Sequence, residues 1–173
     1  MRIRRAKVTD APGIAKVHVD SWITTYRNIV PEEYLNGLKY EDSERLWNRN
    51  LQHSTVFVAE NEVGEIIGFA DSGKERSGDY PKISGEVYSI YILEVYQGQG
   101  VGKLLMQAVC NELLSNDIYS LIVWVLKENQ FSGFYENLGG KVIDEKYILI
   151  ADKQILEIAY HWTEVSQIVN RGE

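Results

Sequence analysis

The most constraining feature of the sequence is a turn with three glycines that lies between a strand-like and a helix-like segment. The segment before it, Val87–Val95, is rich in β-branched and aromatic residues, which favour a largely buried strand. After it, apolar residues recur at a helical spacing from Val101 to Leu113. Glycine reaches left-handed dihedral angles and lets other groups approach closely, and the free N–H groups of a helix N-terminus attract anions. This succession predicts a phosphate-binding turn that leads into a helix.

The spacing of the glycines excludes two common phosphate loops. Positions 98, 100 and 102 are one residue short of the G-x-G-x-x-G pattern that binds dinucleotides. The nucleotide P-loop fails because Leu104 follows Gly102-Lys103, and because Gln97 stands where its first glycine belongs. The remaining pattern is Gln97-x-x-Gly100-x-Gly102, directly after a buried strand. A turn without a ligand is the alternative interpretation, but such a turn needs one glycine, and each further glycine carries an entropic cost.

This pattern closely resembles the pyrophosphate loop of the GNAT superfamily, the acyl-CoA-dependent N-acyltransferases. A second segment, Asn129-Gln-Phe-Ser-Gly-Phe-Tyr-Glu-Asn-Leu-Gly139, resembles the N-x(4-5)-F-Y-E-x-x-G motif that these enzymes carry on the helix after their fifth strand. The segments Trp22–Pro31 and Glu157–Trp162 are also similar to a bacterial branch of the superfamily. The likeness therefore extends across most of the chain.

The resemblance implies direct transfer of an acetyl group from acetyl-CoA, acting as co-substrate, to an amine, with no metal. It assigns the pyrophosphate of CoA to the glycine turn and the pantetheine arm to the backbone of the preceding strand. The residues that it gives to the cofactor are Ile90, Tyr91, Ile92, Gln97, Gly98, Gln99, Gly100, Val101, Gly102, Lys103, Asn129 and Ser132. Asn129 has an alternative role as the cap of its own helix. Gln130–Gly133 departs from the small and basic residues usual in the bacterial branch, so the contacts of this segment with CoA stay open.

Two residues are candidates for proton transfer. Glu86 is the candidate base, acting on the amine through water. Strict alternation along the strand places it on the same face as Tyr88, Ile90 and Ile92. The alternative for Glu86 is a solvated carboxylate at the start of the strand. Tyr135 matches the family tyrosine that donates a proton to the departing thiolate, and its alternative is an aromatic residue of the core.

The length of 173 residues predicts a single domain over residues 1–173. We expect an α/β fold with a mixed, mostly antiparallel sheet of about seven strands flanked by helices, as in the GNAT superfamily. The expected strands are 3–6, 55–60, 66–72, 87–95, 119–126, 141–150 and 154–162. The expected helices follow Thr9 and Val101 and cover 32–38, 40–51 and 128–138. The helix between residues 87 and 126 makes this part a β-α-β unit.

Composition narrows the setting and the partners. A net charge of −7 argues against nucleic-acid binding and mildly favours a cationic or amine substrate. The resemblance implies that the acceptor is a primary amine of a small molecule or a peptide. No apolar run approaches the roughly 20 residues that span a membrane, and the single Cys110 cannot form an internal disulfide. We expect a cytoplasmic protein, with a homodimer as one option. The aromatic residues Trp22, Tyr26, Tyr34 and Trp47 either wall the acceptor site or belong to the core. A non-catalytic acyl-CoA-binding regulatory protein is the alternative function.

Overall fold

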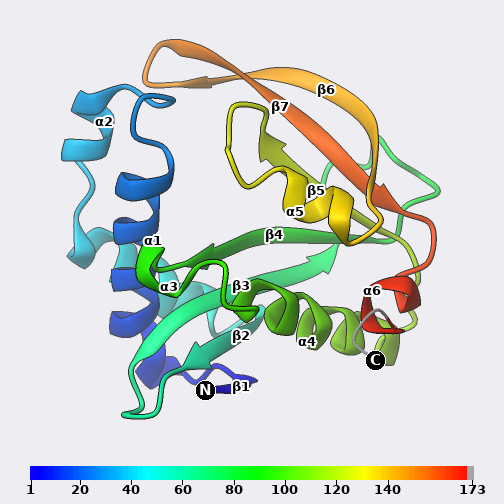
Figure 1. The fold of residues 1–173 in the computed structure, drawn as a ribbon, viewed down its shortest axis with the longest axis horizontal. Coiled ribbons are helices and arrows are strands. Elements are labelled where there is room, and N and C mark those ends of the chain that lie inside the picture. The colour runs from blue at the N-terminus through cyan, green and yellow to red at the C-terminus, as the bar shows by residue number, and fades with distance from the viewer. Residues whose placement is uncertain (171–173) are drawn as a thin grey trace.

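The computed structural model describes residues 1–170, and a seven-stranded sheet runs through it with helices on both faces (Figure 1). The strands are β1 (Arg2–Arg5), β2 (Thr55–Glu60), β3 (Ile66–Lys74), β4 (Gly85–Ile92), β5 (Leu121–Leu126), β6 (Lys141–Ile150) and β7 (Lys153–Trp162). Their order is β1-β2-β3-β4-β5-β7-β6. Neighbouring strands run antiparallel, except that β4 and β5 run parallel. The predicted α/β fold and mixed, mostly antiparallel sheet are confirmed.

The helices divide between the two faces of the sheet. They are α1 (Ala11–Thr25), α2 (Glu32–Asn36), α3 (Tyr40–Asn50), α4 (Val101–Ser115), α5 (Gly133–Asn137) and α6 (Ser166–Asn170). In Figure 1, α4 and α6 lie on one side of strands β2–β4, and α1 and α3 lie on the other. The alternation of β2 follows this division, because Val56 and Val58 pack with Phe69 near α1, whereas Phe57 contacts the cluster around Leu105 of α4.

Several elements differ from the expected boundaries, among them the following three. The helix expected at 128–138 forms only over α5, because the residues before it make successive tight turns. In these turns the Asn129 side chain accepts a hydrogen bond from the Phe131 N–H at 3.0 Å, and the Ser132 N–H bonds to the Asn129 carbonyl at 3.0 Å. β4 ends at Ile92 because a single turn of 3-10 helix over Glu94–Tyr96 redirects the chain. β5 begins at Leu121, two residues later than expected.

The parallel pairing of β4 and β5 is short. It joins Gly85–Val87 to Leu121–Val123, although β4 continues to Ile92 and β5 to Leu126. Beyond Val87 the two strands diverge, as Figure 1 shows. The backbone groups of β4 that face β5 there lack a strand partner. A sheet of seven strands thus has an opening at its centre, and unpaired backbone donors and acceptors line it.

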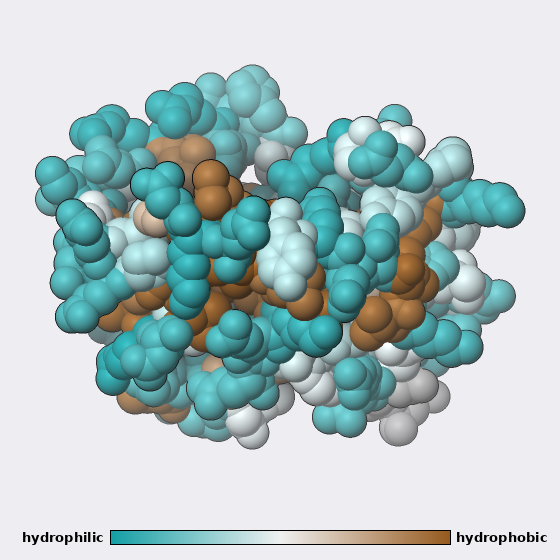
Figure 2. Space-filling view, turned by 90° about the horizontal axis from the view of Figure 1, so that it is seen from above, coloured by the Kyte–Doolittle hydropathy of each residue, from teal (hydrophilic) through white to brown (hydrophobic). Residues whose placement is uncertain are grey.

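The β6–β7 hairpin forms one end of the sheet and carries exposed apolar side chains on its edge strand. Val142, Ile143, Tyr147 and Leu149 are 44–67% exposed. Figure 2 looks onto the side of the molecule that carries this hairpin and shows apolar surface between hydrophilic residues. Over residues 1–170, no helix is long and apolar enough to cross a membrane. In the same part of the chain, no group of three His, Cys, Asp or Glu side chains is arranged to hold a metal ion.

Candidate active site

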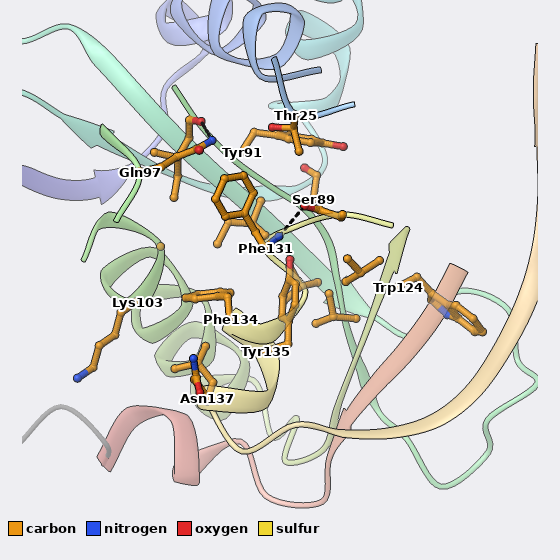
Figure 3. Close-up of a pocket in the computed structure, with 18 of the residues that line it drawn as sticks. Thr25, Ser89, Tyr91, Gln97, Lys103, Trp124, Phe131, Phe134, Tyr135 and Asn137 are labelled. Atoms are coloured by element: carbon orange, nitrogen blue, oxygen red, sulfur yellow. Dashed lines mark hydrogen bonds between the residues drawn. The ribbon is translucent and has the colours of Figure 1, made fainter. Parts of the chain in front are cut away.

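A cavity of about 450 Å³ fills the opening between β4 and β5 (Figure 3). Its walls come from β4 and β5, from the glycine turn at the start of α4, and from the segment that contains α5. The main lining residues are Tyr88, Ser89, Ile90, Tyr91, Ile92, Gln97, Gly98, Gly100, Gly102, Lys103, Phe131, Phe134 and Tyr135. The cavity therefore joins the two motifs that the sequence singled out.

Three glycines of the turn serve two different purposes. Gly98 and Gly100 have φ angles of 70° and 82°, in the left-handed region that favours glycine. A Cβ atom at either position would meet no atom within 4 Å, so this part of the turn is open. At Gly102 a Cβ would lie 3.2 Å from the side chains of Ile92 and Phe134, so this glycine permits close packing. Gly100 caps the 15-residue helix α4, whose first N–H groups and dipole favour an anion.

The residues predicted around the glycines separate into two groups. Gln97 lines the cavity and donates a hydrogen bond from Nε2 to the Ile92 carbonyl at 3.0 Å, which ties the turn to the end of β4. Lys103 also lines the cavity, and its side chain extends outward from the start of α4 in Figure 3. The side chains of Gln99 and Val101 do not line the cavity. Gln99 donates to the Val95 carbonyl at 2.7 Å, and Val101 is buried in the core.

A β-bulge at Tyr88 corrects the predicted orientation of β4. Asp71 pairs with Ser89 and Ser72 pairs with Val87, so Tyr88 is the extra residue. Val87 consequently shares the α4 face with Ile90 and Ile92. The prediction that Glu86 lies on the face of Ile90 and Ile92 is therefore wrong. Glu86 lies on the opposite face, with Tyr91.

The bulge also brings Ser89 to the cavity, a residue that the sequence analysis missed. Its hydroxyl donates a hydrogen bond to the carboxylate of Asp71, the residue opposite on β3. Burial raises the pKa of Asp71 to about 6, against the lowering effect of this hydrogen bond. Asp71 is thus a buried carboxyl group directly behind the cavity wall.

Tyr135 packs in the core and also faces the cavity. Its ring belongs to the core and stacks on Tyr160, with 5.4 Å between the centroids. Its hydroxyl points into the cavity in Figure 3. Burial raises the pKa of Tyr135, and the nearby phenols of Tyr26 and Tyr160 add to this effect. The hydroxyl therefore stays protonated near neutral pH and is available as a donor.

The second motif is only partly directed at the cavity. Asn129 lines it, and its side-chain oxygen accepts a hydrogen bond from the Phe131 N–H. This bond closes a turn ahead of α5, whose N-cap is Ser132, so the alternative that Asn129 caps this helix is wrong. Ser132 does not line the cavity, and its side chain lies near the phenol of Tyr160. Phe131 and Phe134 do line it. Their apolar side chains were the available signal for this contact, with Phe131 inside the departure from the family pattern and Phe134 in the Phe-Tyr pair of the motif.

A second cavity, of about 520 Å³, lies beside the first. The two share Tyr26, Val87, Tyr88, Tyr91 and Trp124, so they meet around β4. The charged residues that line the second cavity are Glu75, Arg76, Glu86, Lys146 and Glu157. Of the aromatic residues proposed for an acceptor site, Trp22 and Tyr26 line this cavity, whereas Trp47 is buried in the core beside Phe69.

Glu86 is held by Arg76. The Glu86 residue is 6% exposed, so the alternative of a solvated carboxylate is wrong. Arg76 donates from Nη2 to Oε1 at 2.6 Å and from Nε to Oε2 at 3.2 Å, and its backbone N–H bonds to Oε2 at 3.2 Å. The hydrogen bond to Glu86 raises the pKa of Arg76. The guanidinium also lies 3.9 Å from the centroid of the Tyr88 ring.

Comparisons with known proteins agree on one family. The model of the Acetyltransferase (GNAT) family matches residues 20–139. The uncharacterized N-acetyltransferase YuaI of Bacillus subtilis (strain 168) is 40% identical over 167 residues, which are 96% of this chain and 95% of that protein. The L-methionine sulfoximine/L-methionine sulfone acetyltransferase of Pseudomonas aeruginosa is 27% identical over 144 residues, which are 81% of this chain and 80% of that protein.

Solved structures share the fold. YncA of Salmonella typhimurium, solved with its cofactor acetyl-CoA, has a TM-score of 0.72 and 18% identity, and the match covers 95% of this chain and 94% of that one. PaiA N-acetyltransferase of Thermoplasma acidophilum, in complex with coenzyme A, has a TM-score of 0.67 and 22% identity, covering 90% and 96%. At these identities the likeness concerns the fold alone.

Proposed function

The chain belongs to the GNAT family of acetyltransferases, and we propose that it moves the acetyl group of acetyl-CoA directly to a primary amine of a small molecule or a peptide. The observation that carries this proposal is the opening between β4 and β5. It leaves an edge of β4 that has no strand partner from Tyr88 to Ile92 and that ends at an open glycine turn.

This arrangement suits the shape and chemistry of acetyl-CoA. The pyrophosphate would lie over Gly98–Lys103, where helix α4 presents free N–H groups. The pantetheine arm carries amide groups, which can pair with the free edge of β4 as an added strand does. Phe131 and Phe134 would cover its apolar parts. The thioester would then reach the region around Tyr88 and Tyr91, where the two cavities meet.

The chemical step needs a neutral amine and a protonated leaving group. The lone pair of the amine attacks the thioester carbon, a C–N bond forms, and the C–S bond breaks with its electron pair going to sulfur. We propose that Glu86 receives, through water, the proton that the ammonium loses before attack, and that the second proton leaves the nitrogen to solvent as the amide forms. Tyr135 donates its proton to the CoA thiolate, and the phenol is then reprotonated from solvent. The N–H groups of the free β4 edge would stabilise the oxyanion, and holding both reactants together supplies much of the rate.

The acceptor would occupy the second cavity, whose walls carry Trp22, Tyr88 and Trp124 beside charged groups of both signs. Such a lining fits an amine with an apolar or polar body. The relative that acts on L-methionine sulfoximine and sulfone supports the inclusion of amino-acid amines among the candidates. A polyamine fits less well, because Arg76 and Lys146 also line the cavity.

A screen of acceptors tests the function. Acetyl-CoA would be incubated with L-methionine sulfone, aryl-alkyl amines, polyamines and a peptide with a free N-terminus, and released thiol would be measured. We expect thiol release that depends on at least one amine. If acetyl-CoA binds and no amine in the screen promotes thiol release, the alternative of a non-catalytic acyl-CoA-binding regulatory protein gains the support.

Two expectations about the setting remain proposals. A homodimer is supported by the exposed apolar side chains of the β6 edge strand, and sedimentation equilibrium tests it. A purely monomeric sedimentation profile would contradict the dimer. The cytoplasmic location expected from the sequence stays a prediction, which localisation of a tagged chain checks.

A further inference from the structure

Most charged groups of the second cavity are already engaged. The Glu75 carboxylate accepts hydrogen bonds from the Ser77 hydroxyl at 2.5 Å and from the Gly78 N–H at 2.8 Å, inside its own loop. Glu86 is held by Arg76. The Lys146 ammonium lies 3.8 Å from the centroid of the Trp124 ring, a cation–π contact. These contacts fix four of the five charged side chains of the cavity wall.

Glu157 is the exception. It lies on β7, opposite Lys146 on β6 and Leu126 on β5. Lys146 faces it directly in the register, yet the ammonium is placed over the ring of Trp124. Among residues 1–170, no hydrogen bond to the Glu157 carboxylate and no ion pair within 4.0 Å is found. The cavity thus contains a carboxylate without a direct partner.

The environment of Glu157 makes this carboxylate notable. Burial raises its pKa, and Glu86 raises it further, whereas Lys146 lowers it. A partly buried anion is costly without a partner, so a cation that enters the cavity gains by binding there. The five charged residues that line the cavity sum to a formal charge of −1, since three are acidic and two are basic. A single ammonium group balances that charge.

Glu157 also lies close to the junction of the two cavities. Tyr26 lines both, and its pKa is raised first by burial and also by the nearby Glu157. Tyr26 in turn is near enough to influence Tyr135, the proposed acid. An amine held by Glu157 would consequently lie near the thioester end of the cofactor cavity.

We infer that Glu157 binds the ammonium group of the acceptor and thereby selects for acceptors that carry a single cation near an apolar body. This inference rests on the proposed function and separates two tasks. Glu157 holds the amine in its charged form, and Glu86, which lies close to it, receives the proton through water before attack. Loss of Glu157 should therefore weaken acceptor binding, whereas loss of Glu86 should slow the chemical step.

Benzylamine is a suitable probe, because it joins one ammonium to an aromatic ring that Trp22, Tyr88 and Trp124 can contact. Titration calorimetry would measure its binding to the enzyme saturated with CoA, which cannot transfer an acetyl group. We expect millimolar or tighter binding that Glu157→Gln weakens by about tenfold or more, since a hydrogen bond to a charged group is lost. Glu157→Asp should recover part of it. Benzyl alcohol, the neutral isostere, should bind both proteins equally.

The matched control is Glu145→Gln. Glu145 lies on β6 of the same hairpin, its side chain is 59% exposed, and it pairs with Lys127 at 3.2 Å, away from both cavities. This variant should bind benzylamine as the parent does. Equal benzylamine affinity in the parent and in Glu157→Gln, or no binding at millimolar concentration, overturns the inference. Titration with acetyl-CoA separates the two ideas: a parent that fails to bind acetyl-CoA refutes the proposed function, whereas normal acetyl-CoA binding with unchanged benzylamine affinity refutes only the role of Glu157.

Discussion

Arg76 and Glu86 form a two-point ion pair in which a mostly exposed guanidinium holds a buried carboxylate. The Nη2–Oε1 and Nε–Oε2 distances are 2.6 Å and 3.2 Å, and the Arg76 side chain is 59% exposed while that of Glu86 is 8% exposed. The pair ties the loop after β3 to the start of β4, at the wall of the second cavity. Glu86 is thereby fixed in orientation, as a base that acts through an ordered water requires.

Replacing the Glu86 carboxylate should slow the reaction without weakening the binding of acetyl-CoA. We expect Glu86→Gln to lower kcat by about 100-fold, the usual scale of general base catalysis, and to leave the KM for acetyl-CoA unchanged, because Glu86 does not line the cofactor cavity. Steady-state kinetics with an accepted amine measure both constants. An unaltered kcat would remove Glu86 from the mechanism.

Alanine variants of two glycines with the same backbone conformation allow an effect on cofactor binding to be distinguished from an effect on stability. Gly100 in the turn and Gly64 in the β2–β3 hairpin have φ angles of 82° and 84°, and a Cβ atom would meet nothing within 4 Å at either position. Gly100→Ala and Gly64→Ala should each lower the free energy of unfolding by about 1–2 kcal/mol, the cost of a left-handed alanine. Only Gly100→Ala should weaken the binding of acetyl-CoA, by about tenfold, because the added methyl group enters the proposed pyrophosphate site.

Denaturant unfolding and titration calorimetry check this pair. Equal losses of stability with a selective loss of acetyl-CoA affinity would support the assignment of the turn. If Gly64→Ala weakens acetyl-CoA binding as much as Gly100→Ala does, the effect comes from general destabilisation. The glycine turn is then not the pyrophosphate site.

The two stacked tyrosines of the core allow a similar comparison. Tyr135→Phe should lower kcat by about 100-fold, because the proton donor to the thiolate is lost. It should keep the stacking on Tyr160 and hence most of the stability. Tyr160→Phe removes a hydroxyl that bonds to Glu136 at 3.0 Å outside the cavity and should keep kcat. A normal rate for Tyr135→Phe in pre-steady-state acetyl transfer would show that its hydroxyl is dispensable.

Asp71 predicts a pH-dependent change in stability. Its folded pKa of about 6 lies above its ordinary value of 3.8, so its contribution to stability is full below about pH 4 and is lost as the pH rises through 6. Asp71→Asn should consequently stabilise the protein at pH 8 by as much as about 3 kcal/mol, and the gain should vanish near pH 4. Urea unfolding at several pH values measures the difference. A gain that does not change with pH would contradict the assigned pKa.

The parts of the site that depend on local sequence could be predicted. The three glycines between a strand and a helix determine the turn by themselves, because left-handed angles and close approach are properties of these residues. The apolar period after Val101 likewise determines α4. Tyr135 was found through its motif, and the structure places its ring in the core and its hydroxyl toward the cavity, while its role as a proton donor stays a proposal.

The parts that depend on pairing between distant segments could not. The bulge at Tyr88 arises from the register of β4 against β3, and no residue of β4 indicates it in the sequence. Because of this bulge, Glu86 lies on the face of β4 opposite to the one predicted. Arg76 lay in a polar loop with no sign that it would reach Glu86. The Glu157 carboxylate lacks a direct partner because the Lys146 ammonium on the neighbouring strand lies over the Trp124 ring instead. The sequence does not show which of these two contacts Lys146 makes.

A crystal structure of the chain with bound CoA tests the central claim most directly. We expect a diphosphate over the N–H groups that follow Gly98, and a pantetheine arm hydrogen-bonded along β4 between Tyr88 and Ile92, with its sulfur near Tyr135. Density for CoA on any other surface, or a β5 that pairs with β4 along its full length and closes the opening, would contradict it.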